Sequence, residues 1–171
     1  MKTVVTILCL FVAAAGASAI ETADFRAASW GMTRERVAEI ETLPVVDEGY
    51  DYLSYDHVLF DEMVTVVYDF ENDVLAKAAY NFMPWPSSYT GLFNECRAAL
   101  VEKYGEPTDE KQVYAGASFP SMTSREMEEA VTGGMLELIA EWETGRSTIR
   151  LWAGKSSDMF PPLVNLRYSR R

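Results

Sequence analysis

The chain contains very little of the two residue types that build most metal sites and nucleophilic active sites. Among 171 residues there is one histidine, His57, and there are two cysteines, Cys9 and Cys96. Zinc is held mainly by Cys and His side chains, so this set is too small to predict a zinc site. Ser–His–Asp and Cys–His mechanisms would both depend on His57 as the base. No Gly-rich phosphate loop or dinucleotide fingerprint is present either, so we predict no cofactor.

Positive charge is also scarce. The chain has 15 Lys and Arg residues against 26 Asp and Glu residues, which gives a formal net charge of −11 at pH 7. A surface of this sign repels phosphate backbones and anionic lipids. We therefore predict no nucleic-acid partner, and we expect most of the acidic residues to form a solvated surface.

Long apolar runs are missing, and the only short one lies at the N-terminus. Lys2 supplies a positive start, Val4 to Ala15 are mostly apolar, and Ala17-Ser18-Ala19 forms an A-x-A cleavage site. A membrane span needs about 20 apolar residues, so this run is too short to be one. We predict that residues 1–19 are a signal peptide cleaved near Ala19. The product would be periplasmic or secreted in a bacterium, without a membrane span.

The position of Cys9 argues against a lipid anchor. A lipoprotein carries its acylated Cys at the end of the apolar run, whereas Cys9 lies in the middle of it. Loss of Cys9 with the leader would leave Cys96 without a disulfide partner in the chain. Leu92, Phe93, Leu100 and Cys96 recur at helical spacing, which predicts a buried thiol.

Residues 20–171 have the length of one domain, and their apolar periodicity changes along the chain. Helical spacing and capping residues predict helices near 33–42, 88–104 and 123–132. Alternating apolar residues predict strands near 52–59, 64–70, 74–82, 136–143, 147–153 and 164–168. We predict an α+β domain of antiparallel strands, in one long sheet or two, with helices packed on one face.

Residues 25–83 and 84–171 share an order of helix followed by strand meander, which suggests two related halves. Their helices open alike, with Met32-Thr33 in one half and Met122-Thr123 in the other. A Met-Thr pair is also simply a good staple and cap, so convergence accounts for the likeness almost as well as duplication.

Two further candidate sites use carboxylates. A pair of acidic residues, with or without His57, is one way to build a small hydrolase, but 26 acidic residues make many pairs. Asp69, Glu71 and Asp73 alternate as calcium ligands do, although Val74 and Tyr80 replace the Gly and Glu of an EF-hand loop. An ordinary hairpin turn accounts for the same residues.

Aromatic residues give one candidate partner-binding surface. Trp85 lies between two prolines in a connection, and Tyr89 follows one helical turn later. A rigid aromatic side chain on a loop is a common anchor for a protein partner. The alternative is that both side chains cover the core at the start of the helix.

Several short motifs give the chain a resemblance to known proteins. They are Trp30 to Thr33 with Val37, Tyr68-Asp69-Phe70, Leu75 to Phe82, and Lys103 to Pro107. With these motifs the chain resembles a group of uncharacterised bacterial exported proteins that carry WGM(S/T)xxxV and KYGxP. It is more distantly similar to small outer-membrane assembly lipoproteins and to β-lactamase inhibitor proteins with α+β repeats. This resemblance implies a binding module, with another envelope protein as its partner.

Our sequence-based hypothesis is therefore a non-enzymatic exported protein that binds a component of the cell envelope. A small hydrolase and a calcium-stabilised structural protein are the alternatives. A deep pocket holding His57 or clustered acidic residues would favour the hydrolase. An exposed apolar patch or an open sheet edge would favour the binding module.

Overall fold

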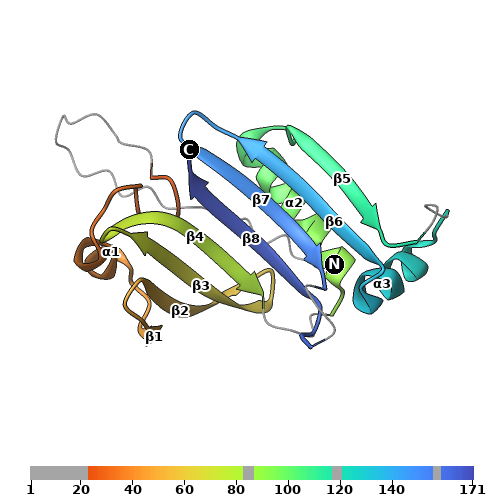
Figure 1. Ribbon diagram of the computed structural model, residues 1–171, viewed down its shortest axis with the longest axis horizontal. Helices are drawn as coiled ribbons and strands as arrows, with labels where there is room; N and C mark the ends of the chain where they lie inside the picture. Colours follow the sequence, from red (N-terminus) through yellow and green to blue (C-terminus); the bar gives the residue numbers. More distant parts are fainter. Residues whose placement is uncertain (1–22, 83–86, 117–120, 156–158) are drawn as a thin grey trace, which may run out of the picture.

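The structure, a computed structural model, describes residues 23–82, 87–116, 121–155 and 159–171. Eight strands form one antiparallel sheet, and three helices pack against it, so the fold is α+β (Figure 1). The predicted signal peptide lies outside the described residues. The elements are α1 (Arg34–Ile40), β1 (Val45–Glu48), β2 (Tyr52–Leu59), β3 (Glu62–Glu71), β4 (Val74–Phe82), α2 (Tyr89–Tyr104), β5 (Asp109–Tyr114), α3 (Ser124–Gly133), β6 (Leu136–Glu143), β7 (Ser147–Gly154) and β8 (Leu163–Arg170).

The strand order is β1-β2-β3-β4-β8-β7-β6-β5. Strands β1 to β4 are consecutive neighbours, as are β5 to β8, and the two groups meet where β4 pairs with β8. In that pairing Ala78 lies opposite Tyr168 and Tyr80 lies opposite Leu166. The sequence had left open one sheet or two, and the β4–β8 pairing makes a single sheet.

The two faces of the sheet differ in burial because successive side chains in a strand point to opposite sides. One face, which we call the core face, carries side chains that are nearly all buried. They include Val64, Val66, Tyr68, Leu136, Leu138, Ala140, Trp142, Ile149, Leu151, Val164, Leu166 and Tyr168. The opposite face, which we call the outer face, carries mostly polar and half-exposed residues along β4, β8 and β7.

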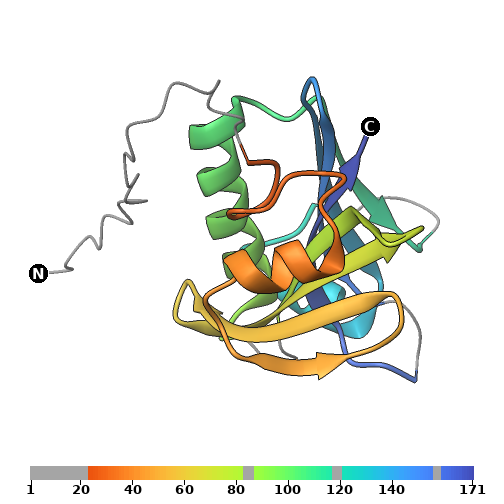
Figure 2. The same cartoon turned by 90° about the vertical axis from the view of Figure 1, so that its left-hand side faces the viewer.

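Helix α2 supplies the largest helical share of the core. Its buried side chains are Tyr89, Leu92, Phe93, Cys96 and Leu100, and they belong to the same cluster as the residues of the core face. In Figure 1 α2 lies behind β6 and β7, and Figure 2 shows it running along one side of the sheet. Cys96 is free and buried, as the helical spacing predicts, and burial raises the pKa of its thiol to about 12.

The segment before α1 also packs into the core. The ring of Phe25 lies 5.4 Å from Tyr68, 4.8 Å from Tyr80 and 5.0 Å from Tyr168. The indole nitrogen of Trp30 donates a hydrogen bond of 2.9 Å to the hydroxyl of Ser147 on β7. Residues from both ends of the chain therefore share one core.

The helix ends agree with the capping residues that the sequence predicts. Thr33, Ser88 and Thr123 are the N-caps of the three helices, and Thr123 forms a capping box with Glu126. At the C-terminus of α3, Gly134 has φ of 78°, a left-handed conformation that glycine adopts without a Cβ clash. No helix among the described ranges is both long and apolar enough to cross a membrane.

The strands differ from the sequence prediction in two respects. The alternation predicted a regular strand near 74–82, but an irregularity in the β3–β4 pairing lies between Asp69 opposite Lys77 and Phe70 opposite Leu75. Ala76 is the extra residue, so Leu75 points inward and is fully buried. Such a bulge changes which residues face the core. The edge strands β1 and β5 were not predicted, because nearly all of their residues are exposed.

Candidate functional site

The outer face is hollowed at its centre, across β4, β8 and β7. The hollow has a volume of about 350 Å³ and is lined by Asn81, Arg150, Trp152, Leu163, Asn165 and Arg167. These residues come from three adjacent strands of both groups, so the hollow exists only because β4 pairs with β8. All six have side chains that are exposed or half-buried.

Two arginines face each other across neighbouring strands in this hollow. Arg150 on β7 lies directly opposite Arg167 on β8. The Nη1 atom of Arg150 lies 3.5 Å from Oε1 of Glu141, its neighbour on β6. No carboxylate of the described ranges lies within ion-pair distance of Arg167, although its charge lowers the pKa of Asp69 against the larger effect of burial.

Two asparagines form the next row of the hollow. Asn81 on β4 lies opposite Asn165 on β8, and Nδ2 of Asn165 donates a 2.5 Å hydrogen bond to Oδ1 of Asn81. Within the described part of the chain, the amide nitrogen of Asn81 has no hydrogen-bond partner. It is therefore a free donor beside the two guanidinium groups.

Trp152 forms the apolar wall of the hollow and is held in place from two sides. Its indole nitrogen donates a hydrogen bond of 3.0 Å to Oε2 of Glu137 on β6. A Cβ atom on Gly154 would lie 2.9 Å from the indole ring, closer than real Cβ contacts allow. Glycine at position 154 is thus what lets the ring lie flat along β7.

The outer face continues toward β2 and β3 with apolar residues. Val58 and Met63 are opposite each other in the β2–β3 pairing, and they are 54% and 49% exposed. Both lie on the outer face. Met63 precedes the core-facing Val64 by one residue and so points to the opposite side, and Val58 is its partner on β2. This face therefore combines an apolar end with the two arginines at its centre.

The predicted aromatic surface does not form part of this hollow. Tyr89 is 5% exposed and belongs to the core, which agrees with the alternative that the sequence left open. Its backbone N–H donates a hydrogen bond of 2.8 Å to Glu128 on α3. Trp85 lies outside the described residues.

His57 lies on β2, opposite Val64, and is half-buried. Its pKa is lowered, first by burial and then by the positive charge of Arg26, while Glu41 opposes the shift. His57 does not line the hollow, which among the described residues contains neither a cysteine nor a carboxylate. The hydrolase alternative stays a prediction.

The carboxylates proposed for calcium have other roles in the hairpin. Lys77 Nζ lies 2.6 Å from Glu71 Oε1, and Asp73 occupies the turn with φ of 62°. Among the described residues, no three His, Cys, Asp or Glu side chains are grouped so that they could hold a metal ion. Calcium binding therefore also stays a prediction.

A buried polar cluster on the core side has a structural role. Arg26 donates two hydrogen bonds to Glu41, of 2.9 and 3.1 Å, and the hydroxyl of Tyr68 donates a third of 2.6 Å. Burial raises the pKa of the Glu41 carboxyl, but these hydrogen bonds and the Arg26 charge lower it by more. The ionised carboxylate ties the N-terminal segment to the end of α1 and to β3.

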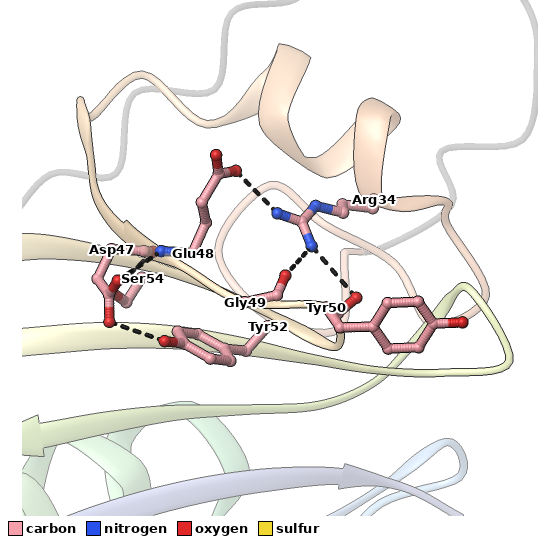
Figure 3. Close-up of polar contacts among 7 residues, drawn as sticks. All are labelled: Arg34, Asp47, Glu48, Gly49, Tyr50, Tyr52 and Ser54. Carbon is pink, nitrogen blue, oxygen red and sulfur yellow. Dashed lines mark hydrogen bonds and ion pairs between the residues drawn. The ribbon is translucent and has the colours of Figure 1, made fainter.

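A second polar cluster supports the sheet edge at β1 (Figure 3). Arg34 of α1 donates hydrogen bonds to Glu48 Oε2, at 2.8 Å, and to the backbone carbonyls of Gly49 and Tyr50. On the other side of the hairpin, the hydroxyl of Tyr52 donates to Asp47 at 2.8 Å. These contacts hold the β1–β2 hairpin against α1 and do not reach the hollow.

Sequence reasoning did not bring Arg150 and Arg167 together. The signal was limited to alternation, which predicts the face of a strand and not its neighbour. Asn81 and Asn165 gave no signal, since a single asparagine in a strand does not indicate which residue lies opposite it. No protein-family model matches this chain, and searches of curated proteins and of solved structures found no match.

Proposed function

We propose that this protein is an exported bacterial protein that binds another component of the cell envelope through the outer face of its sheet. The observation that carries the proposal is the hollow with Arg150 and Arg167 side by side in a chain of net charge −11. A cluster of cationic and amide donors beside an aromatic wall is typical of a recognition surface.

We further infer that the helices cover the core face only, which leaves the outer face for a partner. The buried residues of α1, α2 and α3 belong to one cluster with the core face. The mirrored strand order, with β4 and β8 at the centre, supports two halves related by duplication. The first half would then supply Asn81 to the hollow, and the second half would supply the other lining residues.

Export is tested by the mature N-terminus. We expect the protein from a periplasmic fraction to begin at Ile20, because signal peptidase would cut after Ala19. Mass spectrometry of the intact protein measures this directly. Recovery of the uncleaved chain from the cytoplasm would contradict the assignment.

Binding is tested by photo-crosslinking in cells. A photoreactive residue replaces Thr148, which is half-exposed on the outer face, and a control replaces Arg125, whose side chain is 86% exposed on α3. We expect one envelope protein, identified by mass spectrometry, to be captured from position 148 and not from position 125. Equal capture from both positions, or none, would refute the proposal.

A further inference from the structure

We propose that the hollow binds the carboxylate of an Asp or Glu side chain presented by a protein partner. Arg150 and Arg167 would hold the carboxylate, and Trp152 would pack against the residue beside it. The inference rests on the proposed binding function and adds the chemistry of the ligand. It is argued from the charges, the donors and the shape of the hollow.

The two arginines form an unfavourable pair that a carboxylate would relieve. Like charges directly opposite each other on adjacent strands are destabilising. Glu141 offsets the charge of Arg150, at 3.5 Å, whereas among the described residues no carboxylate lies within 4.0 Å of Arg167, which is attracted only to the more distant Asp69. A guanidinium group offers a planar fork of donors that matches a carboxylate.

The remaining polar groups also fit an acceptor. The amide nitrogen of Asn81 is left as a donor because Asn165 bonds to the amide oxygen of Asn81. The indole nitrogen of Trp152 is already bonded to Glu137, so Trp152 offers the face of its ring. An ionised carboxylate only accepts hydrogen bonds, which matches two guanidinium groups and one amide donor.

The shape of the hollow favours a protein over a small free acid. Its volume of about 350 Å³ is near the lower end for ligand cavities, and the side chain of Arg150 is 50% exposed. A small ligand would remain largely in water. A protein surface would also cover the exposed Val58 and Met63, which lie on the same face.

The surrounding charges disfavour an anionic membrane. Glu137, Glu141, Glu143 and Asp109 lie on the outer face around the arginines, and of these Asp109 pairs with Lys111 and Glu143 with Arg171. A flat anionic surface would meet all of these carboxylates, whereas a single side chain would meet the arginines alone.

The test measures binding of two peptides to the chain from residue 20. The probes are acetyl-Gly-Leu-Glu-Leu-Gly-amide and the same peptide with Gln in place of Glu, and the readout is the indole N–H resonance of Trp152 in NMR spectra, assigned with a Trp152→Phe variant. We expect a saturable shift with the Glu peptide and at least about tenfold weaker binding of the Gln peptide, since charge-assisted hydrogen bonds are lost.

Variants locate the interaction. R150Q/R167Q is expected to lose the Glu preference, and R150K/R167K to bind at an intermediate level because charge is kept without the planar fork. The matched control is R36Q/R125Q, which changes two exposed helix arginines whose partners are Glu39 and Glu129. It should bind as the parent does. Thermal melting checks that every variant is folded.

Three results would overturn the inference. The first is equal binding of both peptides, and the second is the absence of a saturable shift. The third is that the protein binds phosphatidylglycerol vesicles but not phosphatidylcholine vesicles, and that R150Q/R167Q abolishes this binding. If R150Q/R167Q does not change the capture of an envelope protein from position 148, the protein binds a partner but the two arginines do not bind its carboxylate. That result would refute the carboxylate inference and leave the proposed binding function in place. Failure of both experiments would remove both proposals.

Discussion

Two neighbouring buried tyrosines differ in the contacts of their hydroxyl groups. Tyr55 and Tyr68 are each 1% exposed, and their rings pack edge to face at 5.8 Å. The hydroxyl of Tyr68 donates to Glu41, whereas the hydroxyl of Tyr55 has no hydrogen-bond partner among the described residues. A buried hydroxyl without a partner costs free energy, and one bonded to a carboxylate stabilises the fold.

We therefore expect opposite results from removing these hydroxyls. Tyr68→Phe should lower the free energy of unfolding by about 1.5–3 kcal/mol, because a bond to a charged group is lost. Tyr55→Phe should leave it unchanged or raise it by up to about 1 kcal/mol, since the desolvation cost disappears. Urea unfolding of the two variants measures both. A clear loss of stability in Tyr55→Phe would show that its hydroxyl is bonded.

Among the elements, α3 caps the N-terminus of α2. The carboxylate of Glu128 accepts hydrogen bonds from the N–H groups of Tyr89 and Thr90 and from the hydroxyls of Ser88 and Thr90, at 2.6–2.9 Å. Burial raises the pKa of Glu128, but these bonds lower it by more. A depressed carboxyl pKa stabilises the fold above the unfolded pKa of about 4.3.

Glu128→Gln should therefore cost about 1 kcal/mol at neutral pH, since the N-terminal N–H groups of α2 lose a charged acceptor. The difference from the parent should shrink as the pH falls through the folded pKa of Glu128, which lies below the ordinary glutamate range. Urea unfolding across this pH range is the measurement. Glu129→Gln, at an exposed ion pair with Arg125, is the control and should cost less than about 0.5 kcal/mol.

The β3–β4 turn has a conformation that favours glycine at its second central position, where this chain has Asp73. Asn72 and Asp73 have φ of 53° and 62°, a conformation that favours Asn-Gly in two-residue hairpins. We expect Asp73→Gly to raise the free energy of unfolding by about 0.5 kcal/mol, because glycine adopts positive φ without strain. Asp109→Gly, in the exposed edge strand β5, should lower it by about 0.5–1 kcal/mol. Thermal melts of both variants decide; a lower melting temperature for Asp73→Gly would contradict the reasoning.

At the level of the whole molecule, the two groups of strands depend on each other. Phe25 contacts Tyr68 and Tyr80 from the first group and Tyr168 from the second. Separation would also expose the backbone edges of β4 and β8, which pair along Lys77 to Asn81. One shared core and one continuous sheet predict one cooperative unit.

Fragments test this dependence. We expect residues 20–83 and 84–171 to be unfolded when expressed apart, because each loses half of the shared core. The chain from residue 20 should unfold in a single transition. Circular dichroism melts of the two fragments and of the joined chain provide the comparison. A cooperative melt by either fragment would show that the halves are independent domains.

Apolar alternation predicted the inner strands, and capping residues predicted the helix ends. Strands whose sequences lack this alternation were not predicted. Val64, Val66 and Tyr68 alternate because every second residue of a half-buried strand must be apolar. Strand β5 has almost no buried residue, so its sequence carries no alternation. The bulge at Ala76 was also missed. Apolar residues occur at successive positions around Ala76, so the sequence pattern does not reveal one extra residue in the strand.

The sequence by itself determined which residues of the inner strands face inward, apart from the bulge in β4, where the helices begin and end, and that Cys96 is buried. Only the tertiary structure decided that β4 pairs with β8, which places Arg150 beside Arg167 and Asn81 beside Asn165. The physical reason is the range of the interactions. Periodicity and capping act within a few residues, whereas strand pairing is chosen by how the whole core packs.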